Sequence, residues 1–240
     1  MKKLSISLVA MACALAFSSA ASAAVVVITN ARALAGNVTP GDAPGYPVTL
    51  SRSGGYLLET DLTPGSGLNG IVAAATDITI DLGGFKLSGG PAGGANNALN
   101  GIVDLGDRLT VRNGKINSFR VTGMSAPNRP YLIVENVRII NNTGIGIDNT
   151  GGSFARIQDS TVATNAGHGI SCGIGCFVQG SSVSGNGGNG ITLVSGGVVG
   201  NTISDNAGTG IFNFFNAADS RACSNAIVSN GAPVNNVSLC

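Results

Sequence analysis

The chain has 240 residues, with 13 Lys and Arg against 12 Asp and Glu, so its formal net charge is +1. A chain this close to neutral is not a dedicated nucleic-acid binder, because such proteins carry a strong basic excess; we expect no nucleic-acid partner. Only 10% of the residues are charged and 37 are Gly, a composition that supports a folded domain only where apolar residues recur regularly.

The first 23 residues have the pattern of an export signal. Lys2 and Lys3 precede an apolar run over residues 4–17, and Ala21-Ser22-Ala23 forms a small-residue cleavage site. The apolar run is shorter than the ~20 residues that a membrane-spanning helix needs. We therefore expect residues 1–23 to be a signal peptide. The mature chain from Ala24 is then secreted or periplasmic and has no membrane span.

Residues 24–70 precede the regular repeat and are expected to form an N-terminal cap and the first strands. Within them, the stretch from Asn30 predicts a short helix that ends at Gly36, since Gly is typical of the residue just after a helix. Such a cap protects the open strand edges at the end of a stack of strands.

Apolar residues return about every 22 residues over residues 71–227, in three rows. The first row is Leu82, Val111, Val134, Ile157, Val178 and Val198; the second is Leu87, Ile116, Ile139, Val162, Val183, Ile203 and Ile227; the third is Ile71, Ile102, Met124, Ile147, Ile170, Ile191 and Ile211. Short strands separated by Gly and Asn turns, one repeat per coil, are typical of a solenoid. We predict an all-β parallel β-helix of about seven coils over residues 71–227, with residues 228–240 as a C-terminal cap.

One polar position recurs inside this frame, three residues after the second row. It is Asn in five successive coils: Asn142, Asn165, Asn186, Asn206 and Asn230. Stacked amides can bond to one another from coil to coil. We interpret the series as an inward, structural ladder.

Four cysteines remain after removal of the signal: Cys172, Cys176, Cys223 and Cys240. An even number in an exported chain predicts disulfides. The simplest pairing joins Cys172 to Cys176 and Cys223 to Cys240, although three connectivities are possible. A zinc site is disfavoured because the usual CxxC spacing is missing, and we expect no metal and no cofactor.

Two segments carry a family resemblance. Residues 77–89 (DITIDLGGFKLSG) and 109–116 (LTVRNGKI) resemble the opening coils of right-handed parallel β-helix proteins of the pectin-lyase-like class. Residues 38–48 (VTPGDAPGYPV), followed by 54–58 (GGYLL), are similar to the lead-in of exported bacterial β-helix proteins of uncharacterised function. The resemblance implies a right-handed coil. It implies no single activity, because the fold hosts lyases, hydrolases, esterases, epimerases and non-catalytic binders.

A possible catalytic motif lies at residues 167–171 (GHGIS), which resembles the histidine motif of polygalacturonases. That family surrounds its His with three aspartates, whereas here Asp159 is single and the segment 149–151 reads Asn-Thr-Gly. His168 also occupies a variable slot of the repeat. We keep Asp148 and His168 as candidate catalytic residues for the alternative function, a polysaccharide lyase, hydrolase or epimerase.

A second functional signal is basic charge in the first half of the repeat. Residues 86–138 hold seven cations and three acids, whereas residues 139–240 hold two cations and four acids. In the predicted register Lys86, Lys115 and Arg138 occupy the same outward position in successive coils, with Arg112 nearby, where it could pair with Glu135. Coils repeat every ~4.8 Å, roughly the spacing of sugar units.

The function that this pattern favours is non-catalytic. Candidate ligand-binding residues are Lys86, Arg112, Lys115 and Arg138, and the expected partner is an extracellular, acidic polysaccharide. A surface or structural role is the other non-catalytic interpretation, in which these cations only keep the strand faces soluble. An enzyme should bring three or more convergent polar groups to one face, yet the face after the third row has one ionisable group, Asp148.

Overall fold

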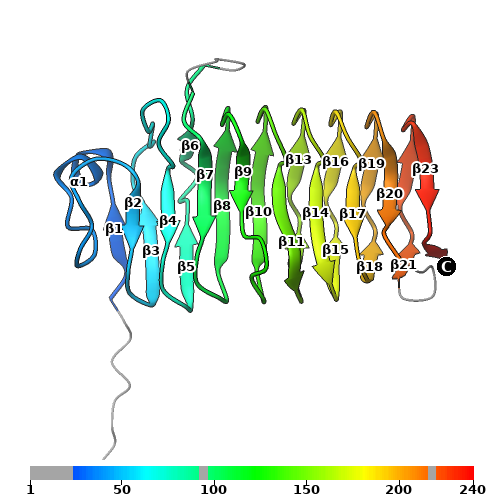
Figure 1. The fold of residues 1–240 in the computed structure, drawn as a ribbon, viewed down its shortest axis with the longest axis horizontal. Coiled ribbons are helices and arrows are strands. Elements are labelled where there is room, and N and C mark those ends of the chain that lie inside the picture. Colours follow the sequence, from blue (N-terminus) through cyan, green and yellow to red (C-terminus); the bar gives the residue numbers. More distant parts are fainter. Residues whose placement is uncertain (1–23, 92–96, 216–219) are drawn as a thin grey trace, which may run out of the picture.

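The computed structural model describes residues 24–91, 97–215 and 220–240. These residues form a rod in which short strands stack side by side along the long axis (Figure 1). The pairs between strands are parallel throughout the described sheets. The expected signal peptide, residues 1–23, lies outside the described residues.

Two sheets form the walls of the rod. The first has fifteen strands among the described residues, ten of them in one path: β1 (Val26–Ile28), β3 (Gly54–Leu58), β5 (Ile78–Asp81), β8 (Thr110–Asn117), β10 (Ile133–Ile140), β12 (Arg156–Gln158), β15 (Cys176–Gln179), β18 (Gly196–Val199), β21 (Ser220–Cys223) and β24 (Ser238–Leu239). The other five lie beside this path: β6 (Lys86–Ser88), β13 (Thr161–Ala163), β16 (Ser182–Ser184), β19 (Thr202–Ser204) and β22 (Ala226–Val228).

The second sheet faces the first across the core. Its nine strands within the described ranges are β2 (Val48–Leu50), β4 (Ile71–Ala73), β7 (Asn100–Asp104), β9 (Thr122–Ser125), β11 (Ile147–Ser153), β14 (Ile170–Ile174), β17 (Ile191–Leu193), β20 (Thr209–Asn213) and β23 (Ala232–Asn235). One strand per coil gives about eight turns, close to the seven expected. The all-β parallel solenoid is therefore confirmed.

The core consists of the apolar rows. The second and third rows have the predicted register: Leu87 pairs with Ile116, and Ile71 with Ile102. The prediction for the first row was wrong at its start, because Ile80, not Leu82, pairs with Val111. The side chains of β5 alternate so that Ile78 and Ile80 point inward. Leu82 lies two residues further on and is also buried.

The predicted asparagine ladder is present and buried. Asn142 donates both its backbone N–H (3.1 Å) and its side-chain Nδ2 (2.8 Å) to Oδ1 of Asn165, and the same pair of bonds joins each later rung to the next as far as Asn230. The ladder satisfies backbone donors at a turn where the sheet bonds are interrupted.

A second ladder runs parallel to it and was not predicted. Ser160 Oγ accepts from the Val137 N–H, and each later side-chain oxygen accepts from the N–H of the preceding rung, through Ser181, Asn201 and Asn225. Ser and Asn can both serve as rungs of this ladder, because a hydroxyl oxygen and an amide oxygen can each accept a hydrogen bond from a backbone N–H.

The N-terminal end of the rod carries the helix α1 (Asn30–Ala35), as predicted (Figure 1). Thr29 Oγ1 accepts from the Arg32 N–H (3.1 Å) at its start, and Gly36 ends it with φ 75°. Ala33 is fully buried and joins α1 to the core. At the other end, β23 and β24 keep the register of β20 and β21.

Both cysteine pairs have the simplest predicted connectivity. Cys172 is bonded to Cys176, with 6.0 Å between their Cα atoms, and Cys223 is bonded to Cys240, with 5.0 Å. The first bond lies within one coil, and the second joins β21 to the residue after β24.

Candidate functional site

Three of the candidate cations share one outward column on the first sheet. Lys86 pairs with Lys115 across β6 and β8, Lys115 pairs with Arg138 across β8 and β10, and Thr161 follows in β13. Successive side chains in such a column lie ~4.8 Å apart.

Lys86 is neutralised by an acid from the preceding coil. Its Nζ lies 3.3 Å from Asp61 Oδ2, and its backbone N–H donates to Asp61 Oδ1 (3.0 Å). Asp61 belongs to the same column because its neighbour Leu62 pairs with Leu87. Both charged side chains are about half exposed, so the ion pair contributes little to stability, but it occupies Lys86.

Arg112 is also engaged. We expected Glu135 as its partner, and the two are indeed in register. The ion pair, however, is with Asp81 in the preceding coil, where Arg112 Nε lies 2.9 Å from Oδ2. Asn113 Nδ2 also donates to both oxygens of Asp81, which holds the carboxylate on that side.

Lys115 and Arg138 differ from the other two candidates. Within the described part of the chain neither has an ion-pair partner, and Glu135 in the adjacent column pairs with neither. Between them lies an open depression of about 350 Å³ lined by Gly84, Asn113, Gly114, Lys115, Asn136 and Arg138.

Two asparagines at a bend form the rest of this depression. Asn113 and Asn136 have positive φ (58° and 51°), a conformation that Asn tolerates, and Asn136 Nδ2 donates to Asn113 Oδ1 (3.1 Å). Gly114 lets the chain pack closely on the preceding coil, because a Cβ there would lie 2.3 Å from Cβ of the buried Leu82. Two cations beside Asn136 Oδ1, an amide oxygen with no hydrogen-bond partner among the described residues, can hold an anionic group that also offers a hydroxyl.

Asp148 lies in β11 of the second sheet and His168 in the turn before β14, and no hydrogen bond joins the two in the described structure. His168 Nδ1 accepts from the Asn189 N–H (2.8 Å), and Asn189 Oδ1 accepts from the Thr209 N–H (2.8 Å). Asp148 Oδ1 accepts from the Thr150 N–H (3.1 Å). His168 is thus one rung of a third, short ladder, and its Nδ1, which faces Asn189 in the next coil, already accepts a hydrogen bond.

Burial sets the protonation of this histidine. It lowers the pKa of His168, and the Asp148 carboxylate opposes that shift only in part. The neutral imidazole matches its role as an acceptor, since protonation at Nδ1 would remove the bond from the Asn189 N–H.

Residues 65–199 match the family model described as the right handed beta helix region. This is more than half of the sequence. The chain belongs to the right-handed β-helix family. No curated protein and no solved structure matches it.

A buried carboxylate in this right-handed β-helix was not singled out from the sequence. Asp104 is only 2% exposed; its Oδ1 accepts from the Gly106 N–H (3.1 Å), and its Oδ2 has no hydrogen-bond partner in the part of the chain that the structure describes. Burial raises the pKa of Asp104 to about 6, although the nearby Arg129 lowers it. It follows Ala73 in an inward row of the second sheet, where an acid is unexpected.

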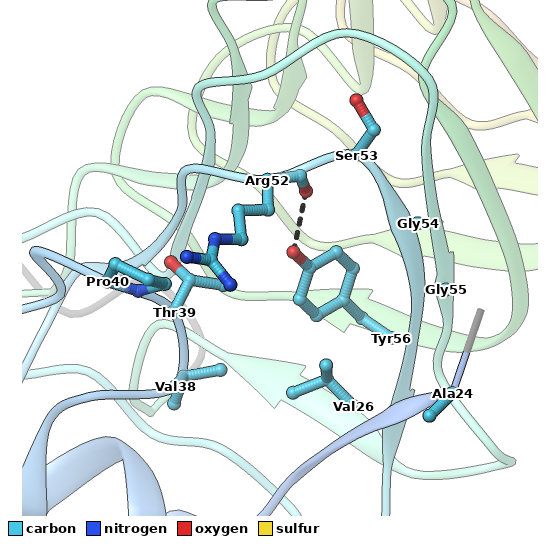
Figure 2. Close-up of a pocket in the computed structure, with 10 residues that line it drawn as sticks. All are labelled: Ala24, Val26, Val38, Thr39, Pro40, Arg52, Ser53, Gly54, Gly55 and Tyr56. Atoms are coloured by element: carbon cyan, nitrogen blue, oxygen red, sulfur yellow. Dashed lines mark hydrogen bonds between the residues drawn. The ribbon is translucent and has the colours of Figure 1, made fainter.

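A small pocket lies at the N-terminal end of the β-helix (Figure 2). It has a volume of about 220 Å³ and is lined by Ala24, Val26, Val38, Thr39, Pro40, Arg52, Ser53, Gly54, Gly55 and Tyr56. The Tyr56 hydroxyl donates to the Arg52 carbonyl (2.6 Å), and the Thr39 hydroxyl donates to the Thr49 carbonyl (2.6 Å). These donors are used within the cap, so we assign the pocket no ligand.

No other chemistry stands out in the described residues. They contain no group of three or more His, Cys, Asp or Glu side chains that could hold a metal ion. Within the same ranges, no helix is long and apolar enough to cross a bilayer.

Proposed function

We propose that this right-handed β-helix is exported and binds an acidic polysaccharide, without cleaving it, at the depression between Lys115 and Arg138. The observation that carries the proposal is a pair of adjacent cations with no ion-pair partner in the described chain. The other two candidates, Lys86 and Arg112, are held by acids.

The chemistry of the depression suits an acidic sugar. Lys115 and Arg138 would contact a carboxylate or sulfate, and bonds between charged groups and such anions are stronger than neutral ones. Asn136 Oδ1 has no partner among the described residues and would accept from a sugar hydroxyl. The site is short: Asp61 neutralises Lys86 on one side, and Thr161 follows on the other. We therefore expect one or two acidic sugar units to be bound directly.

The test is retention of uronate and sulfated galactan polymers by the wild-type protein and by the double variant Lys115→Ala/Arg138→Ala. We expect wild-type retention that weakens at high salt, because exposed charges are screened over about 10 Å at 0.1 M. Each lost charged contact removes ~1–2 kcal/mol, so the double variant should bind at least tenfold more weakly. Lys86→Ala is the matched control and should change affinity less than threefold.

Product analysis separates binding from catalysis in the same samples. New reducing ends or unsaturated sugars that disappear in Asp148→Asn or His168→Asn would contradict the non-catalytic proposal. Equal retention by wild type and by Lys115→Ala/Arg138→Ala would rule out the proposed site.

A further inference from the structure

A line of exposed apolar side chains follows one edge of the rod. The turns that follow β9, β11 and β20 expose Tyr131 (48%), Phe154 (55%) and Phe215 (74%), and the last residue of β14 exposes Ile174 (58%). These turns form the lower edge of the rod in Figure 1. Soluble proteins seldom expose such contiguous apolar groups unless the surface contacts something.

Two of these aromatic residues have a left-handed backbone conformation, which is unfavourable for bulky side chains. Tyr131 and Phe154 have φ of 58° and 56°, and the next coil places Gly175 there with φ 67°. The three are aligned, because the Tyr131 N–H donates to the Ser153 carbonyl and the Phe154 N–H to the Ile174 carbonyl. Bulky residues in left-handed backbone are genuine outliers and gather at functional sites. The two rings stack at 5.4 Å, yet remain half exposed.

A column with two arginines lies directly behind this edge. It reads Arg156, Phe177, Gly197 and Arg221 from β12 to β21. The Arg156 guanidinium lies 5.5 Å from the centre of the Phe177 ring. Neither arginine has an ion-pair partner in the described chain. The described residues of these turns, 130–134, 153–157, 173–178, 194–198, 214–215 and 220–221, include no acid; Asp219, directly before β21 in the sequence, lies outside the described residues.

The edge is also notched between two of its apolar side chains. Ile174, Val194, Ser195 and Phe215 line an open hollow of about 360 Å³. Ser195 is the single polar side chain among them, so a sugar would find few hydrogen-bond partners, whereas an acyl chain would find apolar walls on both sides.

We propose that this edge docks on a lipid bilayer that carries anionic headgroups. Phe154, Ile174 and Phe215 enter the boundary between headgroups and acyl chains, and Tyr131 lies at its polar side, as amphipathic rings do at membrane interfaces. Arg156 and Arg221, one column behind, meet the anionic headgroups. Five coils at ~4.8 Å give a straight line of about 20 Å, which fits a flat surface. Charge complementarity favours this occupant over a second copy of the chain.

This surface is separate from the basic depression. Tyr131 precedes the first half of β10, whereas Arg138 lies in its second half, beyond the bend at Asn136. The rod could therefore contact a bilayer and still present Lys115 and Arg138, and the docking proposal does not rest on glycan binding.

The test is flotation of the protein with phosphatidylcholine vesicles with and without phosphatidylglycerol. The chain is taken from Ala24, because the apolar residues 4–17 would bind lipid themselves; circular dichroism checks that it and each variant have the β-structure. We expect binding to the phosphatidylglycerol vesicles and at least a tenfold loss in Phe154→Ser/Phe215→Ser. In Arg156→Gln/Arg221→Gln the preference for phosphatidylglycerol should fall about 25-fold, roughly fivefold for each cation.

Val121→Ser is the matched control, because Val121 is 44% exposed but belongs to a different turn. It should bind like the wild type. Three results would overturn the proposal: no binding to either vesicle, equal binding by wild type and Phe154→Ser/Phe215→Ser, or a wild-type dimer in gel filtration that this variant converts to monomer. The last result would assign the edge to a second copy instead.

Discussion

At the scale of single residues, the pKa shifts of Asp104 and His168 bear on stability rather than on the proposed site. Asp104 lies in an inward row with one oxygen unpartnered, and His168 is a rung of a backbone ladder. Each should therefore make folding depend on pH in its own direction, because a group whose pKa differs between folded and unfolded chain links stability to pH.

Asp104→Asn should stabilise the protein at neutral pH. The pKa of Asp104 is raised to about 6 from 3.8, so the folded state favours the protonated acid. The stability that protonated Asp104 contributes is fully present below pH 3.8 and is lost as the pH rises through 6. That loss lowers the free energy of unfolding by on the order of 1–3 kcal/mol. The measurement is the free energy of unfolding by denaturant from pH 4 to 8. The gain in Asp104→Asn should grow across that range; a gain that is constant or falls would contradict the assignment, and Asp107→Asn serves as the more exposed control.

His168 should show the opposite dependence. Burial lowers its pKa below 6.5, so the neutral form belongs to the folded state and its contribution is present above 6.5. That contribution is lost as pH falls through the lowered value. His168→Asn keeps an acceptor, as Asn189 does in the next coil, and should remove this acid-side loss. Thermal unfolding of the wild type and of His168→Asn between pH 4.5 and 7.5 measures this loss of stability at acid pH. If the unfolding temperatures of the two proteins change in parallel with pH, the protonation of His168 is not linked to folding.

At the scale of elements, the ladders replace sheet bonds where the coil turns. Asn186 is 1% exposed; its Oδ1 accepts two bonds from Asn165, and its Nδ2 donates to Asn206 Oδ1 and to the Val162 carbonyl. Removing it leaves buried donors and acceptors without partners, the costly case for a hydrogen bond.

Asn186→Ala should therefore lower the free energy of unfolding by about 2–4 kcal/mol. Asn230→Ala, at the half-buried last rung, is the control and should cost less, because water can reach the groups that it frees. Denaturant titration followed by circular dichroism compares them. An equal loss at both positions would mean that the ladder is not stabilised by its buried bonds.

Much of this architecture is predictable because each coil repeats the same requirements. Second-row and third-row residues such as Ile139 and Ile147 were placed correctly, since the spacing hardly changes after Gly101. The first row failed at Leu82 because the turn between β5 and β6 is longer than its equivalent in the next coil: Ile80 pairs with Val111 and Leu87 with Ile116, so the segment from Ile80 has two more residues. The ladder through Ser160 and Asn201 was missed because its residue type changes and its dipeptides look like ordinary turns.

The site was harder to predict than the fold, because it depends on which cations are paired with acids. The register of Lys115 and Arg138 follows from the repeat, but the acids that occupy Lys86 and Arg112 come from the coil before, where the spacing is irregular. The aromatic edge was missed because Gly175 interrupts the series that Tyr131 and Phe154 begin.

At the scale of the whole molecule, charge is paired between coils rather than spread in one basic face. Residues 59–138 hold seven acids and seven cations. Four ion pairs join adjacent coils there: Lys86 with Asp61, Arg108 with Asp77, Arg112 with Asp81, and Arg129 with Asp107. The apparent excess of the region 86–138 is thus offset by acids just before it. Three of its cations, Lys115, Arg120 and Arg138, have no ion-pair partner in the described residues, and of these Lys115 and Arg138 are paired in register on neighbouring strands.

The most direct measurement of this central claim is a calorimetric titration of an acidic oligosaccharide into wild type and Lys115→Ala/Arg138→Ala at several salt concentrations. We expect the wild-type affinity to fall steadily as the salt concentration rises, and the double variant to bind at least tenfold more weakly with little salt dependence. A wild-type affinity that does not change with salt concentration, or a double variant that binds as tightly as the wild type, would contradict the proposed binding site.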